Sequence, residues 1–218
     1  MADVEGGKMN VKNIIITLLI SLGVIALMSV MLFRMGGQEQ DTNVVYEGVA
    51  GDERHVKGDG AVVMVEFSDF QCPACKSAEG PVQEILSRYE GQVKFVYRHL
   101  PLNTIHPNAQ MAAQASEAAH MQGKFYEYHD LLFETQIEWS QESDPRELFV
   151  GYAGRLGLDI DKFRSDMESE EAEDIVNKDS LDASRLGLSS TPSFFLNGER
   201  VDLSGLELKI QENLNSGE

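Results

Sequence analysis

Two cysteines are the residues of this chain whose type and spacing most directly predict chemistry. Cys72 and Cys75 are the only cysteines among 218 residues. If they open a helix, residues three apart share one face, and the two sulfurs are close enough to form a disulfide. Free N–H groups and the helix dipole favour an anion at the first position, and the thiolate is the reactive form. We therefore expect Cys72 to be an exposed nucleophile and Cys75 a shielded resolving thiol in thiol–disulfide exchange.

Three other interpretations of the cysteine pair stay open. A structural disulfide would close a loop too short to stabilise the fold by much. Half of a zinc site would need further ligands, yet the five histidines include no pair with zinc-finger spacing, so we expect no metal site. The third interpretation is two unrelated thiols. A redox pair is favoured because the CxxC motif follows a predicted buried strand in a strand–helix–strand context.

The elements that must position the cysteines are visible in the pattern of apolar residues. Residues 61–67 form an apolar, β-branched run, as in a strand buried on both faces. Pro73 suits the first turn of the helix that follows, and its helical pattern continues to about residue 89. A second apolar strand is predicted at 93–97. Strand, helix and strand in this order predict a βαβ unit with a parallel strand pair.

The rest of the domain is predicted to be a helical block followed by a hairpin and a helix. Residues 104–188 look helical almost throughout. A strand is expected at 193–196, a return strand at 200–203 after the turn signal Asn197-Gly198, and a last helix at 206–214. Thr191-Pro192 stands at the entrance of the first of these strands, where either a cis or an ordinary trans proline is permitted.

Glu66 is a charged residue inside the predicted buried strand. If its side chain faces the interior, burial should raise its pKa, and a carboxyl near Cys75 could then relay protons during exchange. The alternative is that Glu66 lies at the strand end and faces water.

The N-terminal part of the chain contains an apolar segment. Residues 14–33 are twenty residues without a charge, long enough for a helix that crosses the hydrocarbon core of a membrane. Lysines precede this segment, so we expect a single-pass anchor with residues 1–13 as a short cytoplasmic segment. A cleaved signal peptide is the alternative, but no small-x-small site follows. Residues 34–57 are predicted to be a linker, with a short edge strand at 44–46.

The charge balance excludes one class of partner. With 36 acidic and 18 basic residues the net charge is −18, which disfavours nucleic-acid binding. Much of the excess lies between residues 138 and 182. A solvated acidic face is the favoured interpretation; a docking surface for a basic partner or a calcium site is the alternative, although no EF-hand spacing is present.

Several segments together resemble a known family. Residues 65–75 (VEFSDFQCPAC) resemble the active-site segment of DsbA-like thioredoxin proteins. Residues 98–102 (RHLPL), His106-Pro107 with the alanine-rich stretch that follows, and Thr191-Pro192 followed by FFLNG are also typical of this family. The resemblance covers residues 58–214.

The resemblance implies a thioredoxin-like α/β fold over 58–218 with a helical insertion at about 104–188, after the single transmembrane helix. It implies that Pro192 is cis and faces the CxxC motif, that Thr191 binds substrate through its backbone, and that Glu66 matches a buried acidic residue. Pro73 and Ala74 would complete the substrate-binding surface. The redox-active disulfide would be the only cofactor.

Known members of the family oxidise exported proteins and are reoxidised by a quinone-linked membrane oxidase of the DsbB or VKOR type. The sequence is therefore predicted to encode a dithiol oxidase on the extracytoplasmic side of the cytoplasmic membrane. One departure is Ala74, where the best-known oxidising member has a histidine. A reductase or isomerase therefore stays open, although isomerases of this type usually carry a dimerisation domain and 34–57 is too short for one. A membrane-tethered binding or chaperone module is the alternative from another class.

Overall fold

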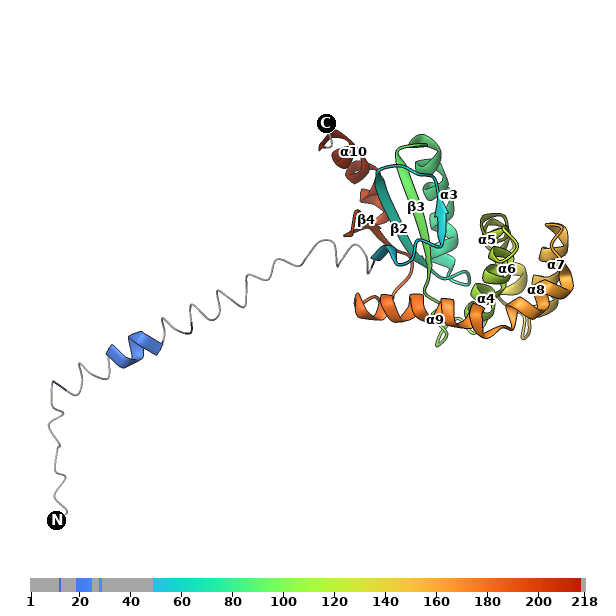
Figure 1. The fold of residues 1–218 in the computed structure, drawn as a ribbon, viewed down its shortest axis with the longest axis horizontal. Coiled ribbons are helices and arrows are strands. Elements are labelled where there is room, and N and C mark those ends of the chain that lie inside the picture. Colours follow the sequence, from blue (N-terminus) through green and yellow to red (C-terminus); the bar gives the residue numbers. More distant parts are fainter. Residues whose placement is uncertain (1–11, 13–18, 25–27, 29–48, 217–218) are drawn as a thin grey trace, which may run out of the picture. The chain divides into compact units, whose positions relative to one another are not determined.

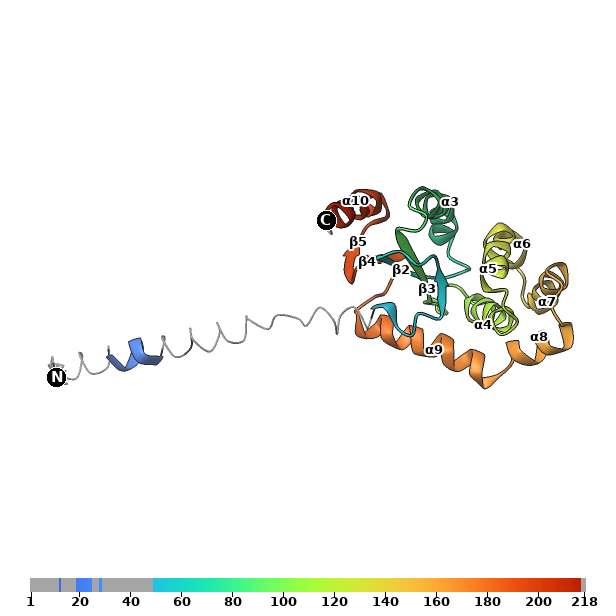
Figure 2. The same ribbon diagram turned by 45° about the horizontal axis from the view of Figure 1, so that its top comes forward.

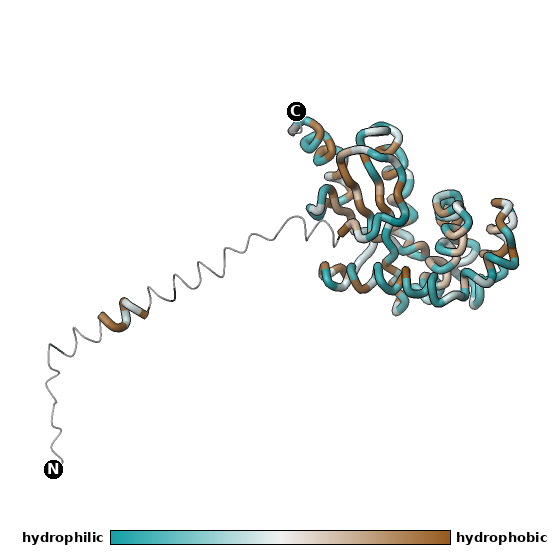
Figure 3. Tube along the Cα trace, in the orientation of Figure 1, coloured by the Kyte–Doolittle hydropathy of each residue, from teal (hydrophilic) through white to brown (hydrophobic). Residues whose placement is uncertain are grey.

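The computed structural model describes residues 12, 19–24, 28 and 49–216. The chain divides into two units, Met1–Asp41 and Thr42–Glu218. In the first unit the described residues are helical, and those at 19–24 and 28 are exposed and mostly apolar (Figure 3).

No helix within the described parts of the chain is both long and apolar enough to cross a membrane. The anchor predicted at 14–33 falls mostly outside the described residues, as do the edge strand predicted at 44–46 and most of the linker at 34–57.

A five-stranded sheet with the order β1-β3-β2-β4-β5 forms the centre of the second unit (Figure 1). β2 runs parallel to β3, which places Glu66 beside Tyr97, and the other strand pairs are antiparallel. The predicted βαβ unit is therefore confirmed. The strands are β1 (His55–Lys57), β2 (Val62–Ser68), β3 (Val93–His99), β4 (Ser193–Leu196) and β5 (Glu199–Val201).

Helices cover both faces of the sheet and form a further group beside it. Figure 2 shows α3 and α10 on one face, α9 across the other, and α4 to α8 next to the sheet. The block from α4 to α9 is inserted in the chain between β3 and β4, as predicted. The helices are α3 (Pro73–Arg88), α4 (Ala109–His120), α5 (Phe125–Glu134), α6 (Gln136–Trp139), α7 (Arg146–Arg155), α8 (Ile160–Met167), α9 (Glu170–Arg185) and α10 (Leu206–Ser216).

Alternation along β2 divides the interior into two cores. Met64 packs in the larger core, which includes residues of α3, α10 and the insertion. Val65, its neighbour in sequence, points to the opposite face of the sheet and packs in the smaller core, which includes Ala183 of α9. All seven residues of β2 are buried, so the strand is central, as its continuous apolar run predicted.

Two local signals in the sequence correspond to defined backbone features. Asn197 and Gly198 both have positive φ, at 47° and 83°, and connect β4 to β5, as expected for the hairpin. Asp159 caps α8 by accepting a hydrogen bond from the Lys162 N–H.

The described part of the domain includes residues before 58, where the sequence places the domain boundary. Val49 and Ala50 are buried in the smaller core. β1 at His55–Lys57 pairs antiparallel with β3, inside the segment predicted as a linker. A strand of three residues has too few alternations to be recognised in sequence, because pairing with β3 rather than local propensity defines it.

A buried ion pair connects the end of β3 to the last helix of the insertion. Arg98 is 2 % exposed, and its Nε and Nη2 atoms donate hydrogen bonds to Asp179 and Asp182 of α9, both at 2.8 Å. The second carboxylate oxygen of Asp179 accepts a hydrogen bond from the His99 N–H at 2.9 Å. Since removing one partner would leave a buried charge uncompensated, these contacts fix the position of α9 on the sheet.

Candidate active site

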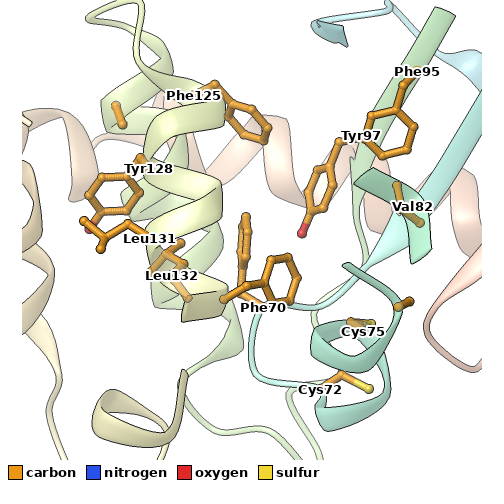
Figure 4. Close-up of a cluster of buried hydrophobic side chains, with 14 of the residues drawn as sticks. Phe70, Cys72, Cys75, Val82, Phe95, Tyr97, Phe125, Tyr128, Leu131 and Leu132 are labelled. Atoms are coloured by element: carbon orange, nitrogen blue, oxygen red, sulfur yellow. The ribbon is translucent and has the colours of Figure 1, made fainter. Parts of the chain in front are cut away.

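Cys72 and Cys75 lie at the start of α3 (Figure 4). Cys72 is the N-cap residue, and both cysteines are free thiols. Cys75 is completely buried, as predicted for a shielded thiol, whereas Cys72 is 7 % exposed. This is less than predicted for an exposed nucleophile, because the Thr191 carbonyl oxygen lies against the Cys72 sulfur at 3.6 Å.

The surroundings of Cys72 lower the pKa of its thiol to about 5. The largest contribution is a hydrogen bond with the Cys75 thiol, and burial acts in the opposite direction. The Thr191 side chain and the backbone N–H groups of Cys75 and Ala74 add to the stabilisation. In the reduced protein Cys72 is therefore a thiolate at neutral pH, which is the reactive form.

Cys75 is in the opposite electrostatic environment. Burial raises the pKa of its thiol far above the ordinary range, and both the hydrogen bond with Cys72 and the charge of Glu66 act in the same direction. Cys75 therefore stays protonated in the reduced protein. The two cysteines thus differ in charge although one helical turn separates them.

Glu66 is buried in the middle of the sheet, which decides between the two interpretations of its position. Its side chain is fully buried, and neither carboxyl oxygen has a hydrogen-bond partner among the described residues. Burial raises the pKa of Glu66 to about 8, with further contributions from the charges of Glu79 and Cys72. A carboxyl group with this pKa is mostly protonated at neutral pH.

The Thr191-Pro192 segment lies against the cysteines. Its peptide bond is cis, as the resemblance implies, and β4, which begins at the next residue, pairs with β2. The strand pairing therefore brings Thr191 to the sulfur of Cys72, although the two residues are far apart in sequence.

The loop before Cys72 is held by side chains that the sequence did not indicate as site residues. One oxygen of Asp69 accepts a hydrogen bond from the Gln71 N–H at 2.7 Å. The other oxygen accepts one from the Leu102 N–H at 2.9 Å and lies 2.7 Å from His106 Nδ1. The residue type of Asp69 could have indicated this role, because aspartate side chains commonly form turns by accepting a hydrogen bond from the backbone two residues further on.

The insertion supplies a second set of supports for the same loop. Gln136 donates hydrogen bonds to the carbonyl oxygens of Phe70, at 2.7 Å, and Cys72, at 3.0 Å. The Asn108 N–H donates one to the Gln71 side chain at 2.7 Å. No sequence signal marks Gln136, because its role depends on where α6 packs.

A groove of about 430 Å³ opens next to the cysteines. Pro73 and His106 lie along it, together with two apolar side chains, Ile105 and Ile137. These isoleucines are 67 % and 75 % exposed. Pro73 and Ala74, which are predicted to contact substrate, are both exposed at the start of α3.

The chain matches the family model described as Thioredoxin over residues 53–212 and belongs to this family. Among solved structures, a thioredoxin-like oxidoreductase from Silicibacter pomeroyi is 28 % identical, with a TM-score of 0.65 and coverage of 78 % of this chain and 97 % of that chain. Oxidised BdbD from Bacillus subtilis is 25 % identical, with a TM-score of 0.65 and coverage of 73 % and 92 %. The thiol-disulfide exchange protein alpha-DsbA2 from Wolbachia pipientis shares the fold, at 21 % identity, a TM-score of 0.65 and coverage of 78 % and 96 %.

Similar sequences also occur inside much longer proteins. The Na⁺/H⁺ antiporter NhaA 3 of Salinispora tropica is 44 % identical over 151 residues, which are 68 % of this chain and 22 % of the antiporter. The antiporter NhaA of Herminiimonas arsenicoxydans is 34 % identical over 77 % of this chain and 26 % of its own length. The chain therefore spans about a quarter of the length of these curated relatives.

Fold and family together define the class of protein. The chain is a member of the thioredoxin family with a thioredoxin-like fold and an inserted helical region, and it is similar to a solved thioredoxin-like oxidoreductase. The individual roles predicted for Cys72, Cys75, Glu66, Thr191 and Pro192 stay predictions.

The thiolate of Cys72 should depend on the Cys75 thiol. In the reduced protein the absorbance of the thiolate at 240 nm should appear with a midpoint near pH 5, following the lowered pKa of Cys72. In Cys75→Ala this midpoint should move upward by at least one pH unit, since the largest stabilising contribution is lost. Cys72→Ser should show no transition below about pH 8. An unchanged midpoint in Cys75→Ala would contradict this assignment.

Glu66 should make the stability of the protein depend on pH. Its pKa is raised from 4.5 to about 8 by burial, so its contribution to stability is complete below about pH 4.5 and is lost as pH rises through about 8. Between these values the free energy of unfolding should fall by up to about 1.4 kcal/mol per pH unit.

The matched variant is Glu66→Gln, which keeps the shape and removes the titration. The free energy of unfolding is measured with urea at pH 5, 6.5 and 8. The protein is kept oxidised, with the Cys72–Cys75 disulfide formed, so that neither thiol titrates and the effect of Glu66 is isolated. The difference in slope between wild type and variant is the quantity of interest. Parallel curves would show that Glu66 does not titrate in this range.

Proposed function

We propose that the protein is a dithiol oxidase that transfers the Cys72–Cys75 disulfide to pairs of cysteines in exported proteins. The observation that carries this proposal is the lowered pKa of Cys72, to about 5. A stabilised thiolate favours the reduced form of the pair, and a disulfide whose reduced form is stabilised is a strong oxidant. The Cys72 thiolate is stabilised by Cys75, Thr191 and the backbone at the start of the helix. It therefore does not require a histidine at position 74, where this chain has an alanine.

The proposed reaction has two exchange steps. A substrate thiolate attacks the Cys72 sulfur, the Cys72–Cys75 bond breaks, and Cys75 leaves with the electron pair and takes up a proton. The second substrate thiolate then attacks the substrate sulfur of the mixed disulfide, and Cys72 leaves as a thiolate. The substrate dithiol is oxidised by two electrons, and the CxxC disulfide is reduced by the same two electrons.

Glu66 is the proposed proton donor to Cys75. Cys75 leaves as a thiolate in a site where burial strongly disfavours this charge. Glu66 is protonated at neutral pH because of its own burial, so it can supply the proton that Cys75 needs. The transfer moves the negative charge from the Cys75 sulfur to the Glu66 carboxylate, where it is less strongly disfavoured, and Glu66 recovers the proton when Cys75 gives it up as the disulfide forms again.

The cis Thr191-Pro192 segment and the groove are the proposed contacts for the substrate chain. The Thr191 carbonyl already faces the Cys72 sulfur, so a bound peptide at the mixed disulfide lies next to this backbone. Ile105 and Ile137 offer exposed apolar surface beside Pro73. An extended, unfolded polypeptide with apolar side chains near its cysteines fits this surface.

Location and reoxidation are also proposals. The uncharged segment 14–33 would anchor the protein in the cytoplasmic membrane with its N-terminus inside, so that the domain works in the oxidising extracytoplasmic space. A quinone-linked membrane oxidase of the DsbB or VKOR type would then restore the disulfide. A reductase or isomerase would use the same residues with the reverse electron flow, and a binding module would not need the cysteines.

The direction of electron flow should be set by the reduction potential of the pair. Equilibration of the full chain with glutathione buffers should give a potential more oxidising than about −200 mV. A value near −270 mV, as for thioredoxin, would support a reductase instead.

The double variant Cys72→Ser, Cys75→Ser should lose all ability to oxidise a reduced, unfolded protein. Unchanged biological activity in this variant would support the binding module.

The groove should contribute to the recognition of polypeptides but not of small thiols. Ile105→Ser and Ile137→Ser should each lower kcat/KM for an unfolded cysteine-containing protein by roughly three- to tenfold, because apolar burial on binding is lost. Oxidation of dithiothreitol should be unchanged. Leu208→Ser is the control, since Leu208 is 63 % exposed on α10 and does not line the groove. Equal losses with both substrates, or none, would contradict the role of the groove.

A further inference from the structure

A second group of side chains with metal-ligand chemistry converges inside the protein. His55 of β1, His99 of β3 and Glu117 of α4 are respectively 2 %, 1 % and 0 % exposed. One potential ligand atom from each lies within 4.8 Å of the others. None of these residues takes part in the thiol chemistry proposed for the CxxC motif.

Both histidines approach the same carboxyl oxygen. His55 Nε2 lies 2.8 Å and His99 Nε2 lies 2.7 Å from Glu117 Oε1. The carboxyl group of Glu117 is thus completely buried, and one of its oxygens is directed at two imidazole nitrogens.

The contacts within this group do not satisfy its polar atoms. Within the described residues, His55 Nε2, His99 Nδ1 and Glu117 Oε2 have no hydrogen-bond partner. The short contact from His55 to Glu117 thus lacks hydrogen-bond alignment. Buried polar atoms are rarely left without partners, because each costs the free energy of its lost hydration. Three such atoms in one cluster indicate that the protein alone does not complete it.

The surroundings orient His55 as they do in known metal sites. His55 Nδ1 lies 3.3 Å from the Tyr97 carbonyl oxygen, and the ring stacks on Phe125 with centroids 3.7 Å apart. A hydrogen bond from one ring nitrogen to a carbonyl is the usual second contact of a metal-binding histidine, since it directs the other nitrogen to the ion. Here that other nitrogen is the unpartnered Nε2.

We propose that His55, His99 and Glu117 bind one divalent transition-metal ion, with zinc as the best match. Two imidazole nitrogens and one carboxylate oxygen are a common zinc ligand set that leaves a fourth position for water. Bond lengths of about 2.0–2.2 Å place tetrahedral ligand atoms about 3.3 Å apart. The histidine and glutamate atoms would therefore need to separate by about half an ångström.

A surface pocket and a third histidine, His120, lie next to His55. The His120 ring packs edge-on against the His55 ring, with centroids 5.0 Å apart. A surface pocket of about 230 Å³ is lined by Arg54, His55 and His120, among others. An ion can thus reach the cluster from the surface beside β1.

The ion would connect three elements that are distant in sequence. β1 is the edge strand after the N-terminal segment, β3 carries His99, and α4 is the first helix of the insertion. Since the unfolded chain has no such site, binding would stabilise the folded protein. The proposed role of the ion is structural. It is the same whether the CxxC pair oxidises or reduces its substrates.

The competing interpretation is a buried polar cluster without an ion, and direct binding separates the two. The full chain, purified in detergent with its disulfide formed so that no thiolate binds metal, is stripped with a chelator and dialysed against buffered Zn²⁺. One zinc per chain is expected, with a rise in Tm of about 5–10 °C at a free zinc concentration about 100 times Kd. Co²⁺ should give the visible absorption of tetrahedral nitrogen and oxygen ligation, without a thiolate band.

Two variants and one control test the assignment to these residues. His99→Asn and Glu117→Gln keep the approximate shapes and should each weaken zinc binding by at least about 100-fold. The control is His129→Asn, which removes a comparably buried histidine from the group Glu79, His129 and Asp130 and should bind zinc as the wild type does. Circular dichroism checks that each variant is folded. The Co²⁺ spectrum of the wild type tests the site even if a variant does not fold. Less than about 0.1 zinc per wild-type chain at about 10 µM free Zn²⁺, or wild-type binding by both variants, would overturn the proposal.

Discussion

The chemistry of the site depends on the interaction between the Cys75 thiol and the Cys72 sulfur. This interaction is the largest cause of the lowered pKa of Cys72, and it opposes ionisation of Cys75. Burial strengthens the contrast, because Cys75 has no contact with solvent. A reactive thiolate and a protected thiol therefore coexist one helical turn apart. The remaining features of the site hold this pair in place, supply its protons or bring a substrate to it.

The helical insertion is part of the active site as well as a cover for the sheet. Gln136 holds two carbonyl groups of the loop around Cys72, and Asn108 holds the side chain of Gln71. Both isoleucines of the groove beside the cysteines, Ile105 and Ile137, also lie in the inserted segment. A thioredoxin-like core alone would present the CxxC motif without this loop support and without one wall of the groove.

Sequence patterns gave most of the fold and the reactive pair, because those signals are local. The apolar run of β2, the CxxC spacing and the Asn197-Gly198 turn each depend on neighbouring residues. The burial of Glu66 could be stated only as one of two alternatives, since either face of a strand end was compatible with the pattern.

The features that were not predicted depend on tertiary contacts. β1 is defined by its pairing with β3, and Gln136 by the packing of α6. The cluster of His55, His99 and Glu117 joins residues from three elements, so no fixed spacing reveals it. The N-terminal anchor stays a prediction, since most of residues 14–33 lies outside the described structure.

The last two residues of β3 determine how the insertion is attached. Neighbouring residues of a strand point to opposite faces, and Arg98 reaches α9 while His99 reaches Glu117 of α4. The helices that begin and end the inserted block are thus held from the two sides of one strand. A hinge motion of the block would have to break both contacts at once. The insertion and the sheet should therefore unfold together as a single cooperative unit. Substrates must then be accommodated by movements of loops and side chains instead of a domain motion.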